Sequence, residues 1–322
     1  MASQPLTIVM YHYVRDLART RYPAIKGLDV GAFRAQLDFI RRQYHVITPA
    51  DLVQAVVERH ETGSWDLPPN SLLLTFDDGY ADHFEHVFPL LDEANLQACF
   101  FVPVLAVAEG RVLDVNKIHF VLAAVSDTNR LLGDVVAAID AARAEFDVEP
   151  QAILYARLAR ASRWDPPDIV FIKRALQTAL PAALRARIVD ALFHQYVSCD
   201  EPGFAAELYM NRAQLGALID RGMYIGCHGY AHVRLGHLTP EEQAFEIDQS
   251  LAFVASLGTS TDAWIMCYPY GDTNQSLTEL LRRRKCAAGL TTRVAVATSD
   301  DDPLLLPRID TNDIPVPAVL GH

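Results

Sequence analysis

Two adjacent carboxylates, Asp77 and Asp78, directly follow a run of apolar residues that is typical of a buried strand. The strand is expected over residues 72–76, and Gly79 after the two acids allows a tight turn. Burying a charge is costly unless the charge is paired or bound to a metal. The two acids at this strand end therefore predict a functional site rather than a feature of packing.

Strands and helices are expected to alternate along most of the chain. The expected strands are short apolar runs, at residues 6–13, 72–76, 98–104, 223–227, 263–268 and 287–291. Segments with apolar residues every three or four positions predict helices between them. This alternation is typical of an α/β barrel or of a doubly wound sheet, in which the carboxyl ends of parallel strands face the active site.

A helical block interrupts the alternation. Four helices are expected in it, at residues 135–146, 152–161, 169–180 and 182–196. The block is too apolar to be disordered. We therefore expect residues 1–110 and 205–322 to form one α/β domain, and residues 111–204 to form a helical insertion or subdomain.

Two other predicted strands also end in polar residues. His228 and His232 follow the strand at 223–227, and a Pro-Tyr-Gly turn at 269–271 follows the strand at 263–268. If the strands are parallel, the two histidines and the Pro-Tyr-Gly turn lie at the same end of the sheet as the two acids. The spacing of the histidines would place both imidazoles on one side of a helical turn.

Two imidazoles and one carboxylate form a common catalytic metal site with an open position for water. One of the two acids would bind the metal, and the other would stay free to accept a proton from a water whose pKa the metal lowers. Each motif alone has a plainer explanation, as a turn or as a packed histidine. Their coincidence at three strand ends favours hydrolytic chemistry.

The composition excludes several classes of partner. The chain has 28 Lys and Arg against 40 Asp and Glu, a net charge of −12, which disfavours nucleic acid and anionic membranes. Its five cysteines include no Cys-x-x-Cys pair, so a disulfide framework is not expected. No apolar run approaches the roughly 18 residues that span a membrane, and the first residues lack the features of a signal peptide. The sequence thus predicts a cytoplasmic protein.

These motifs resemble those of the polysaccharide deacetylase family, also called the NodB-homology group or carbohydrate esterase family 4. The Thr-Phe-Asp-Asp-Gly motif of the family is present at residues 75–79, its His-x-x-x-His motif at 228–232, and its Pro-Tyr-Gly motif at 269–271. Gly229 departs from the family pattern, which usually has Ser or Thr after the first histidine. The helical block lies outside the resemblance.

The resemblance implies a distorted (β/α) barrel and metal-dependent removal of an N- or O-acetyl group from a sugar. Carried over to this chain, Asp77 would be the general base, and Asp78, His228 and His232 would bind the metal. Zinc is the expected ion, with cobalt, nickel and manganese as alternatives. The backbone N–H of Tyr270 would help to stabilise the oxyanion.

Two residues of the family's catalytic set are missing from their usual places. The family often has an arginine two residues before the proline of the third motif, where this chain has Cys267. We expect Arg308 to orient Asp77 instead. The late Leu-x-x-His motif that often supplies the general acid has no convincing copy, so His12 is the candidate, and a packed strand-end histidine is the alternative.

The sequence therefore predicts a metal-dependent sugar deacetylase. A small, nucleotide-linked or lipid-linked acetamido sugar is the expected substrate, in preference to a cell-wall polymer. One alternative is an amidohydrolase that acts on another non-peptide C–N bond. A second is a non-catalytic carbohydrate-binding relic, against which the presence of both acids and both histidines argues.

Overall fold

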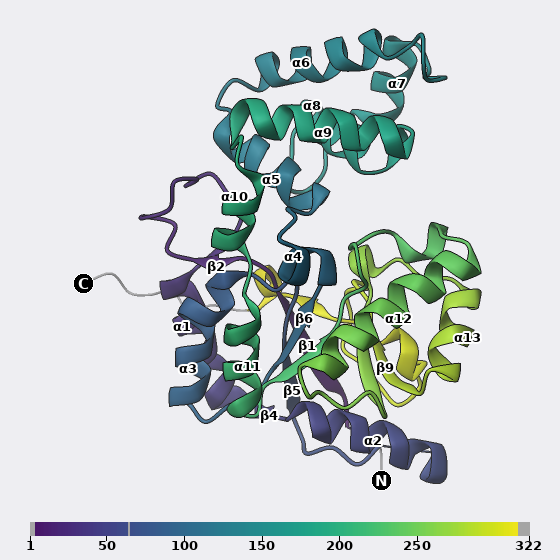
Figure 1. Cartoon of the computed structure of the whole chain (residues 1–322). Helices are drawn as coiled ribbons and strands as arrows, with labels where there is room; N and C mark the ends of the chain where they lie inside the picture. Colours follow the sequence, from purple (N-terminus) through teal and green to yellow (C-terminus); the bar gives the residue numbers. More distant parts are fainter. Residues whose placement is uncertain (1–3, 64, 315–322) are drawn as a thin grey trace. The chain divides into compact units, whose positions relative to one another are not determined.

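The computed structural model describes residues 4–63 and 65–314, and the chain divides into two compact units (Figure 1). The barrel unit comprises Met1–Asp16, Gly27–Arg111 and Ala205–His322, and the helical unit comprises Leu17–Lys26 and Val112–Phe204. The loop Leu17–Lys26 is part of the helical unit, whereas it was expected in the barrel domain.

The barrel unit is built around one parallel sheet. Its strand order is β10-β1-β5-β6-β7-β8-β9, and β4 pairs with β5 beside this path. The strands are β1 (Leu6–Tyr11), β4 (His45–Val46), β5 (Ser71–Phe76), β6 (Cys99–Val102), β7 (Tyr224–Cys227), β8 (Trp264–Cys267), β9 (Cys286–Leu290) and β10 (Ile309–Asp310). A separate pair consists of β2 (Val14–Arg15) and β3 (Leu28–Asp29).

The segment at residues 306–310 closes the sheet on itself. Leu306 pairs with Leu290 at the end of β9, and three residues later Ile309 pairs with Val9 of β1. The two edges of the curled sheet are thereby joined, and Arg308 lies on the segment that joins them. The expected fold class, a distorted (β/α) barrel, is confirmed, and the doubly wound alternative is wrong.

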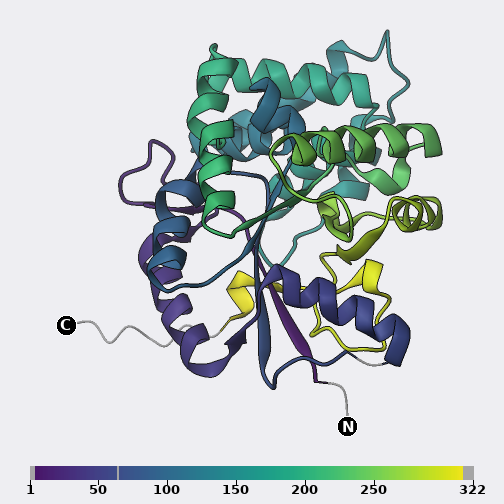
Figure 2. The same ribbon diagram turned by 60° about the horizontal axis from the view of Figure 1, so that its bottom comes forward.

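Helices cover the outside of the sheet. In the barrel unit they are α1 (Val30–Gln43), α2 (Pro49–Thr62), a π-helical turn (His83–Val87) that leads into α3 (Phe88–Glu93), α4 (Val104–Glu109), α11 (Arg212–Asp220), α12 (Pro240–Ser256) and α13 (Gln275–Arg283). Short 3₁₀ turns lie at Leu235–His237, Pro269–Gly271, Pro303–Leu305 and Thr311–Asp313. Helices α11 and α12 pack against β7, and α2 and α13 pack against β9 (Figure 2). A capping box of Thr239 and Glu242 fixes the start of α12.

Successive residues of β5 face two different parts of the core. Leu72 and Leu74 pack with residues of α1 and α11, whereas Leu73 joins a second cluster. Phe101 of β6 and Cys267 of β8 belong to this second cluster, which gathers side chains from strands across the curled sheet. Because both faces of β5 are buried, the acids at its end are held on a rigid element.

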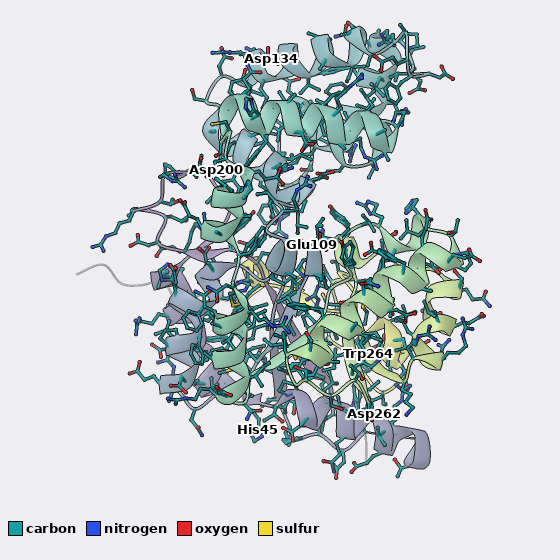
Figure 3. All side chains as sticks on the ribbon, in the orientation of Figure 1. His45, Glu109, Asp134, Asp200, Asp262 and Trp264 are labelled. Atoms are coloured by element: carbon teal, nitrogen blue, oxygen red, sulfur yellow. The ribbon has the colours of Figure 1, made fainter. Side chains whose placement is uncertain are left out.

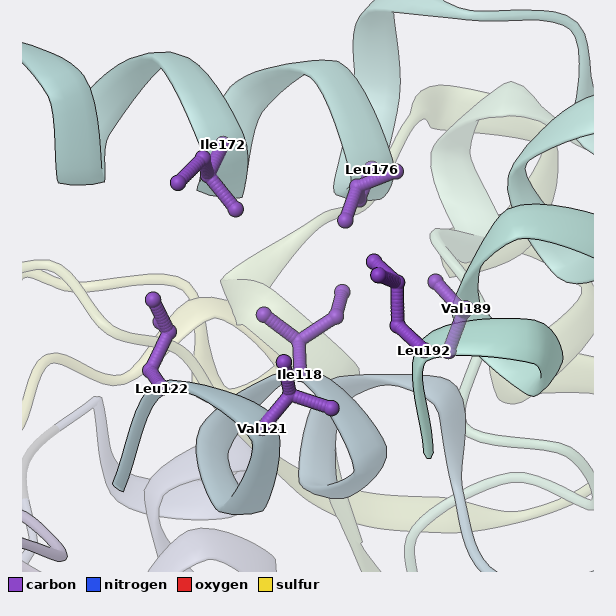
Figure 4. Close-up of a pocket in the computed structure, with 7 residues that line it drawn as sticks. All are labelled: Ile118, Val121, Leu122, Ile172, Leu176, Val189 and Leu192. Carbon is purple, nitrogen blue, oxygen red and sulfur yellow. The ribbon is translucent and has the colours of Figure 1, made fainter. Parts of the chain in front are cut away.

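The helical unit contains α5 (Asp114–Ala124), α6 (Thr128–Ala141), α7 (Gln151–Leu158), α8 (Pro167–Arg174) with a π-helical turn (Ala175–Ala179), and α9 (Ala182–Tyr196). Helix α10 (Glu201–Leu208) begins in this unit. Apolar side chains from α5, α8 and α9, among them Ile118, Ile172 and Leu192, face one another (Figure 4). Helix α5 is not among the four helices expected from the sequence. Its buried residues include Asn116 and Lys117 beside apolar ones, which obscures the helical period.

Within residues 4–63 and 65–314, no helix combines the length and apolarity that a membrane crossing requires.

Candidate active site

The polar residues singled out in the sequence lie at strand ends of the barrel unit. Asp77 and Asp78 follow β5, His228 follows β7, and His12 lies just beyond β1. The sheet is parallel, so these are all carboxyl ends, which meet at one end of a barrel. Arg308 is the exception, because it immediately precedes β10.

Asp78, His228 and His232 form a compact buried group. The Nε2 atoms of His228 and His232 lie 3.3 and 3.2 Å from Oδ1 of Asp78. One ligand-type atom from each of the three residues lies within 4.8 Å of the others. The structure thus brings the three expected metal ligands together.

The two histidines do not lie on a helical turn, so that expectation is wrong. They lie on an irregular loop after β7, in which Gly229 has φ +74° and His232 has φ +55°. The chain reverses through these two left-handed residues, and the reversal brings both imidazoles to Asp78. Glycine adopts a left-handed conformation without strain, whereas the same conformation is unfavourable for the histidine side chain of His232. Strained backbone of this kind is often found at functional sites.

The three residues fit a divalent cation. Oδ1 of Asp78 is buried and has no hydrogen-bond partner among the described residues. Its other oxygen accepts a hydrogen bond of 2.6 Å from Tyr80. Nδ1 of His228 lies 2.7 Å from the carbonyl oxygen of Cys267, to which it can donate, leaving Nε2 free as a ligand atom. A buried oxygen without a donor beside two imidazoles is the arrangement expected of a metal site.

Asp77 is bound in a different way. Both of its oxygens accept hydrogen bonds of 2.8 Å from the two terminal nitrogens of Arg308, whose side chain is 1% exposed. The Nε of Arg308 donates to the carbonyl of Thr291, which fixes the guanidinium. Position 267, where the family often has an arginine, is a cysteine whose sulfur lies 3.4 Å from Oδ1 of Asp77. Arg308 binds this carboxylate instead.

The charges around Asp77 keep it ionised. Burial alone would raise the pKa of Asp77, but Arg308, with smaller contributions from His228 and His12, lowers this pKa to about 2. A second possible metal set, Asp77 with His228 and Cys267, is less suited, because Arg308 already occupies both carboxylate oxygens.

His12 and Tyr270 lie beside this group. Nε2 of His12 is 3.9 Å from Oδ2 of Asp77, and the His12 side chain is 44% exposed, so it is not a fully packed histidine. Its backbone carbonyl lies 2.8 Å from Nε2 of His83. The Tyr270 ring lies 4.9 Å from the His232 ring, and φ of Tyr270 is +59°.

Two supporting residues were missed in the sequence. Tyr80, which donates to Asp78, directly follows the first motif, and its position could have marked it. Glu246 of α12 accepts hydrogen bonds from the backbone of the loop that carries the histidines, and nothing in the helix pattern marks it. In the same loop, the hydroxyl of Tyr230 donates to Glu109, which is labelled in Figure 3.

Comparison with known proteins supports the family resemblance. The sequence model of the polysaccharide deacetylase family matches residues 65–111 and 188–288, which contain all three motifs but neither His12 nor Arg308. No curated protein gave a match.

The fold is similar to those of three solved deacetylases or related proteins. The first is Streptococcus pyogenes deacetylase PplD in complex with acetate, with a TM-score of 0.56 and 15% sequence identity over 96% of this chain and 92% of that chain. The second is IcaB from Ammonifex degensii, with a TM-score of 0.54 and 17% identity over 97% of this chain and 94% of that chain. The third is the BpsB deacetylase domain from Bordetella bronchiseptica, with a TM-score of 0.51 and 16% identity over 95% of each chain. At these identities the likeness shows the fold.

The resemblance to the polysaccharide deacetylase family is therefore confirmed. The same match supports the expectation that the protein is an enzyme of the carbohydrate deacetylase class.

Proposed function

We propose that the protein is a metal-dependent deacetylase that removes an N-acetyl or O-acetyl group from a sugar. One observation carries the proposal: two adjacent carboxylates have opposite surroundings. Asp77 has both oxygens bound by Arg308, whereas Asp78 offers an oxygen without a donor to the space beside two imidazoles. This difference supports Asp78, His228 and His232 as metal ligands and Asp77 as the general base.

A bound divalent cation, with zinc as the expected ion and cobalt, nickel or manganese as alternatives, would lower the pKa of the attacking water. Asp77 would accept the proton of that water, with Arg308 holding the carboxylate in place. The backbone N–H of Tyr270 would donate to the developing oxyanion. The C–N or C–O bond then breaks to release acetate, and His12, which is exposed beside Asp77, would protonate the leaving amine or hydroxyl.

The substrate class we propose is an acetamido sugar, either small or linked to a nucleotide or lipid carrier, and the proposed location is cytoplasmic. Two alternatives remain distinct from it. Hydrolysis of another non-peptide C–N bond would use the same four residues, and a binding protein with a relic site would need none of them to function. The presence of both acids and both histidines disfavours the relic.

Two variants of the adjacent acids test the proposal. Asp78→Asn should lower metal content and activity together, whereas Asp77→Asn should retain metal and lose about 10²–10⁴-fold in turnover. Metal content is measured on protein purified without chelator, and activity by acetate release. Glu241→Gln, on the surface of α12, is a control that should change neither.

The substrates are tested as a panel: acetylated monosaccharides, a nucleotide-linked acetamido sugar, chitooligosaccharides, peptidoglycan, and cyclic amides and formamides. Turnover of the soluble acetamido sugars alone would support the proposed substrate class. Turnover restricted to polymers would overturn it, and turnover of cyclic amides or formamides would favour the amidohydrolase. A wild-type protein that neither holds nor regains metal would favour the relic.

A further inference from the structure

Glu246 is a buried carboxylate whose hydrogen-bond donors among the described residues are backbone N–H groups. It lies on α12 and is 6% exposed, and in the described part of the chain no positively charged side chain pairs with it. Its Oε2 instead accepts hydrogen bonds from the backbone N–H groups of Tyr230 (2.7 Å) and Ala231 (3.0 Å). A buried carboxylate with only peptide donors needs an explanation, because burial raises its pKa and disfavours its charge.

Both donors belong to the loop between the two histidines. The loop reverses through left-handed residues and makes neither helix nor strand hydrogen bonds there. Without Glu246, these two peptide N–H groups would lose their hydrogen-bond acceptor, which is unfavourable for a buried donor.

The two histidines differ in what orients them. Nδ1 of His228 lies 2.7 Å from the carbonyl of Cys267, so that its ring is fixed directly. Nδ1 of His232 is buried and has no hydrogen-bond partner among the described residues. The direction of the His232 ring therefore depends on the backbone just before it, which Glu246 holds at Ala231.

Gly229 is matched to this arrangement. A Cβ atom at position 229 would lie 3.1 Å from Oε2 of Glu246, closer than ordinary contact, and its φ of +74° also disfavours a side chain. The Ser or Thr that the family usually has here would crowd the carboxylate. The departure at Gly229 and the presence of Glu246 thus form one feature of this chain.

We propose that Glu246 is a positioning residue for the metal site, which holds the His228–His232 loop so that His232 can bind the cation. The proposal rests on the proposed function for the identity of the ligands. It predicts a defect in metal affinity beyond any loss of stability.

The test measures the dissociation constant for Zn²⁺ by competition with a chelator, well below the melting temperature. Glu246→Ala should weaken binding about 10–100-fold, and Glu246→Gln should recover most of the affinity because its amide oxygen can accept both N–H groups. Leu218→Ala on α11 is the control for lost stability, with Zn²⁺ affinity unchanged. Equal affinity in wild type and Glu246→Ala, or an equal loss in Leu218→Ala, would overturn the proposal. No Zn²⁺ binding by the wild type would overturn the proposed function itself.

Gly229→Ser gives a second, independent measurement. It should weaken Zn²⁺ binding, whereas Gly258→Ser, at φ +91° with open space around its Cβ position, controls for backbone strain alone. If both variants bind Zn²⁺ equally well, crowding of Glu246 has no part in the site.

A different observation concerns the helical unit. Trp164 is 55% exposed, whereas the other two tryptophans, Trp65 and Trp264, are buried. Trp164 lines a cavity of about 380 Å³ with residues of α5, α8 and the loop at 24–26. This volume is within the range of small-molecule sites, and the cavity lies outside the segments that match the deacetylase family.

Polar groups on the cavity wall limit the choice of ligand. The Asp165 carboxylate pairs with Lys26 at 2.6 Å and with Lys173 at 2.7 Å, and Lys26 also donates to the backbone carbonyl of Trp164. Both ammonium groups already contact Asp165, so the three groups together carry one net positive charge and can still exchange hydrogen bonds with hydroxyl groups. A wholly apolar ligand would cover these charges without satisfying them. A neutral ring with hydroxyl groups matches both the indole and the polar wall.

We propose that this cavity binds a neutral saccharide, with a sugar ring against Trp164 and its hydroxyls toward Asp165 and the lysines. The choice of a sugar rests on the proposed function, but the binding is independent of catalysis. It would give the helical unit a role in holding carbohydrate.

Trp164 also provides the measurement. Titration of the Asp77→Asn protein with a neutral chitooligosaccharide should change the fluorescence of this exposed indole. By calorimetry, Trp164→Ala should weaken binding about tenfold, a typical effect of losing an aromatic contact. Ile153→Ala, an equally exposed apolar position on α7, should leave the affinity unchanged. No fluorescence change, equal binding by Trp164→Ala, or binding of inorganic phosphate at Trp164 would overturn the proposal. If the wild type bound the saccharide but deacetylated no sugar, the proposed binding site would still be supported and the proposed function would be wrong.

Discussion

The guanidinium of Arg308 and the carboxylate of Asp77 form a buried, two-pronged ion pair, with both N–O distances 2.8 Å. Arg308 reaches Asp77 from the segment that closes the barrel, between its contacts to β9 and β1. The family often has its arginine at the position of Cys267, on β8. Fold closure and orientation of the proposed base therefore depend on the same short segment.

Arg308→Met should cost both stability and activity. Removing one partner of a buried ion pair leaves an uncompensated charge, at a cost of about 3–5 kcal/mol. Urea unfolding should show this loss, and kcat/KM should fall in the material that remains folded. Arg308→Lys keeps the charge but not the two-pronged geometry, so it should recover part of the stability and less of the activity. An unchanged unfolding free energy in Arg308→Met would show that the pair is not stabilising.

The pH profile of Arg308→Met should shift at its acidic side. Arg308 is the main reason that the pKa of Asp77 is lowered to about 2 in spite of burial. Without Arg308, burial remains and the pKa of Asp77 rises. A base is active only when unprotonated, so the variant should lose kcat/KM at a higher pH than wild type does. Coincident acidic sides in the two profiles would exclude Asp77 as the titrating base.

The same pair makes stability depend on pH. The pKa of Asp77 is lower in the folded protein than its ordinary value of about 4. The pair therefore stabilises the wild type fully above about pH 4, and this contribution is lost as the pH falls toward about 2. Arg308→Met should lack this dependence, which urea unfolding at a series of acidic pH values measures.

Cys267→Arg should partly rescue a protein that lacks Arg308. The Cys267 sulfur lies 3.4 Å from the same Asp77 oxygen that Arg308 binds, so an arginine at 267 starts close to the carboxylate. Combined with Arg308→Ala, which leaves room for the larger side chain, Cys267→Arg should give a higher kcat/KM than Arg308→Ala alone. A double variant no better than Arg308→Ala would show that the two positions are not interchangeable in this chain.

The central strands of the sheet could be predicted from the sequence because they are strongly apolar. The strand expected at 72–76 is Ser71–Phe76 in the structure, and the one expected at 223–227 is Tyr224–Cys227. The strand expected at 98–104 was too long: Pro103 ends it, and helix α4 follows. The expected helices of the insertion were found where one face is apolar, as in α9 (Ala182–Tyr196), and missed in α5, which is buried on several sides.

For the site, the motifs predicted which residues meet but not how the backbone brings them together. The spacing of His228 and His232 suggested a helical turn, because no sequence pattern reveals a left-handed histidine. The absence of the usual arginine at Cys267 was the signal that pointed to Arg308, more than 200 positions from Asp77. Glu246 had no such signal, because a buried helical carboxylate looks in sequence like an exposed one.

Tyr80→Phe should weaken the metal site without disturbing its packing. The Tyr80 hydroxyl donates to the second oxygen of Asp78 at 2.6 Å, and its ring is stacked on Tyr13 at 4.1 Å. Phenylalanine keeps the ring and removes the donor. Loss of a hydrogen bond to a metal ligand typically lowers metal affinity about 10–100-fold. Zn²⁺ competition should show this weakening with little change in melting temperature. Wild-type affinity in Tyr80→Phe would mean that Asp78 is oriented by other contacts.

His12→Ala tests the proposed general acid. The His12 side chain is 44% exposed and its Nε2 lies 3.9 Å from Asp77, a position from which it could reach a leaving group at the base. If it donates the proton that the leaving amine needs, His12→Ala should lower kcat about 10²–10⁴-fold and leave the metal content unchanged.

The control for this variant is His86→Ala, which removes a histidine outside the proposed site and should keep wild-type turnover. A second substrate separates the role of His12 from a structural one. A sugar ester with a good leaving group needs little help from an acid, so His12→Ala should hydrolyse it at nearly the wild-type rate. Equal losses on the ester and the amide would point to a positioning role for His12. Full turnover of the amide would exclude His12 as the acid.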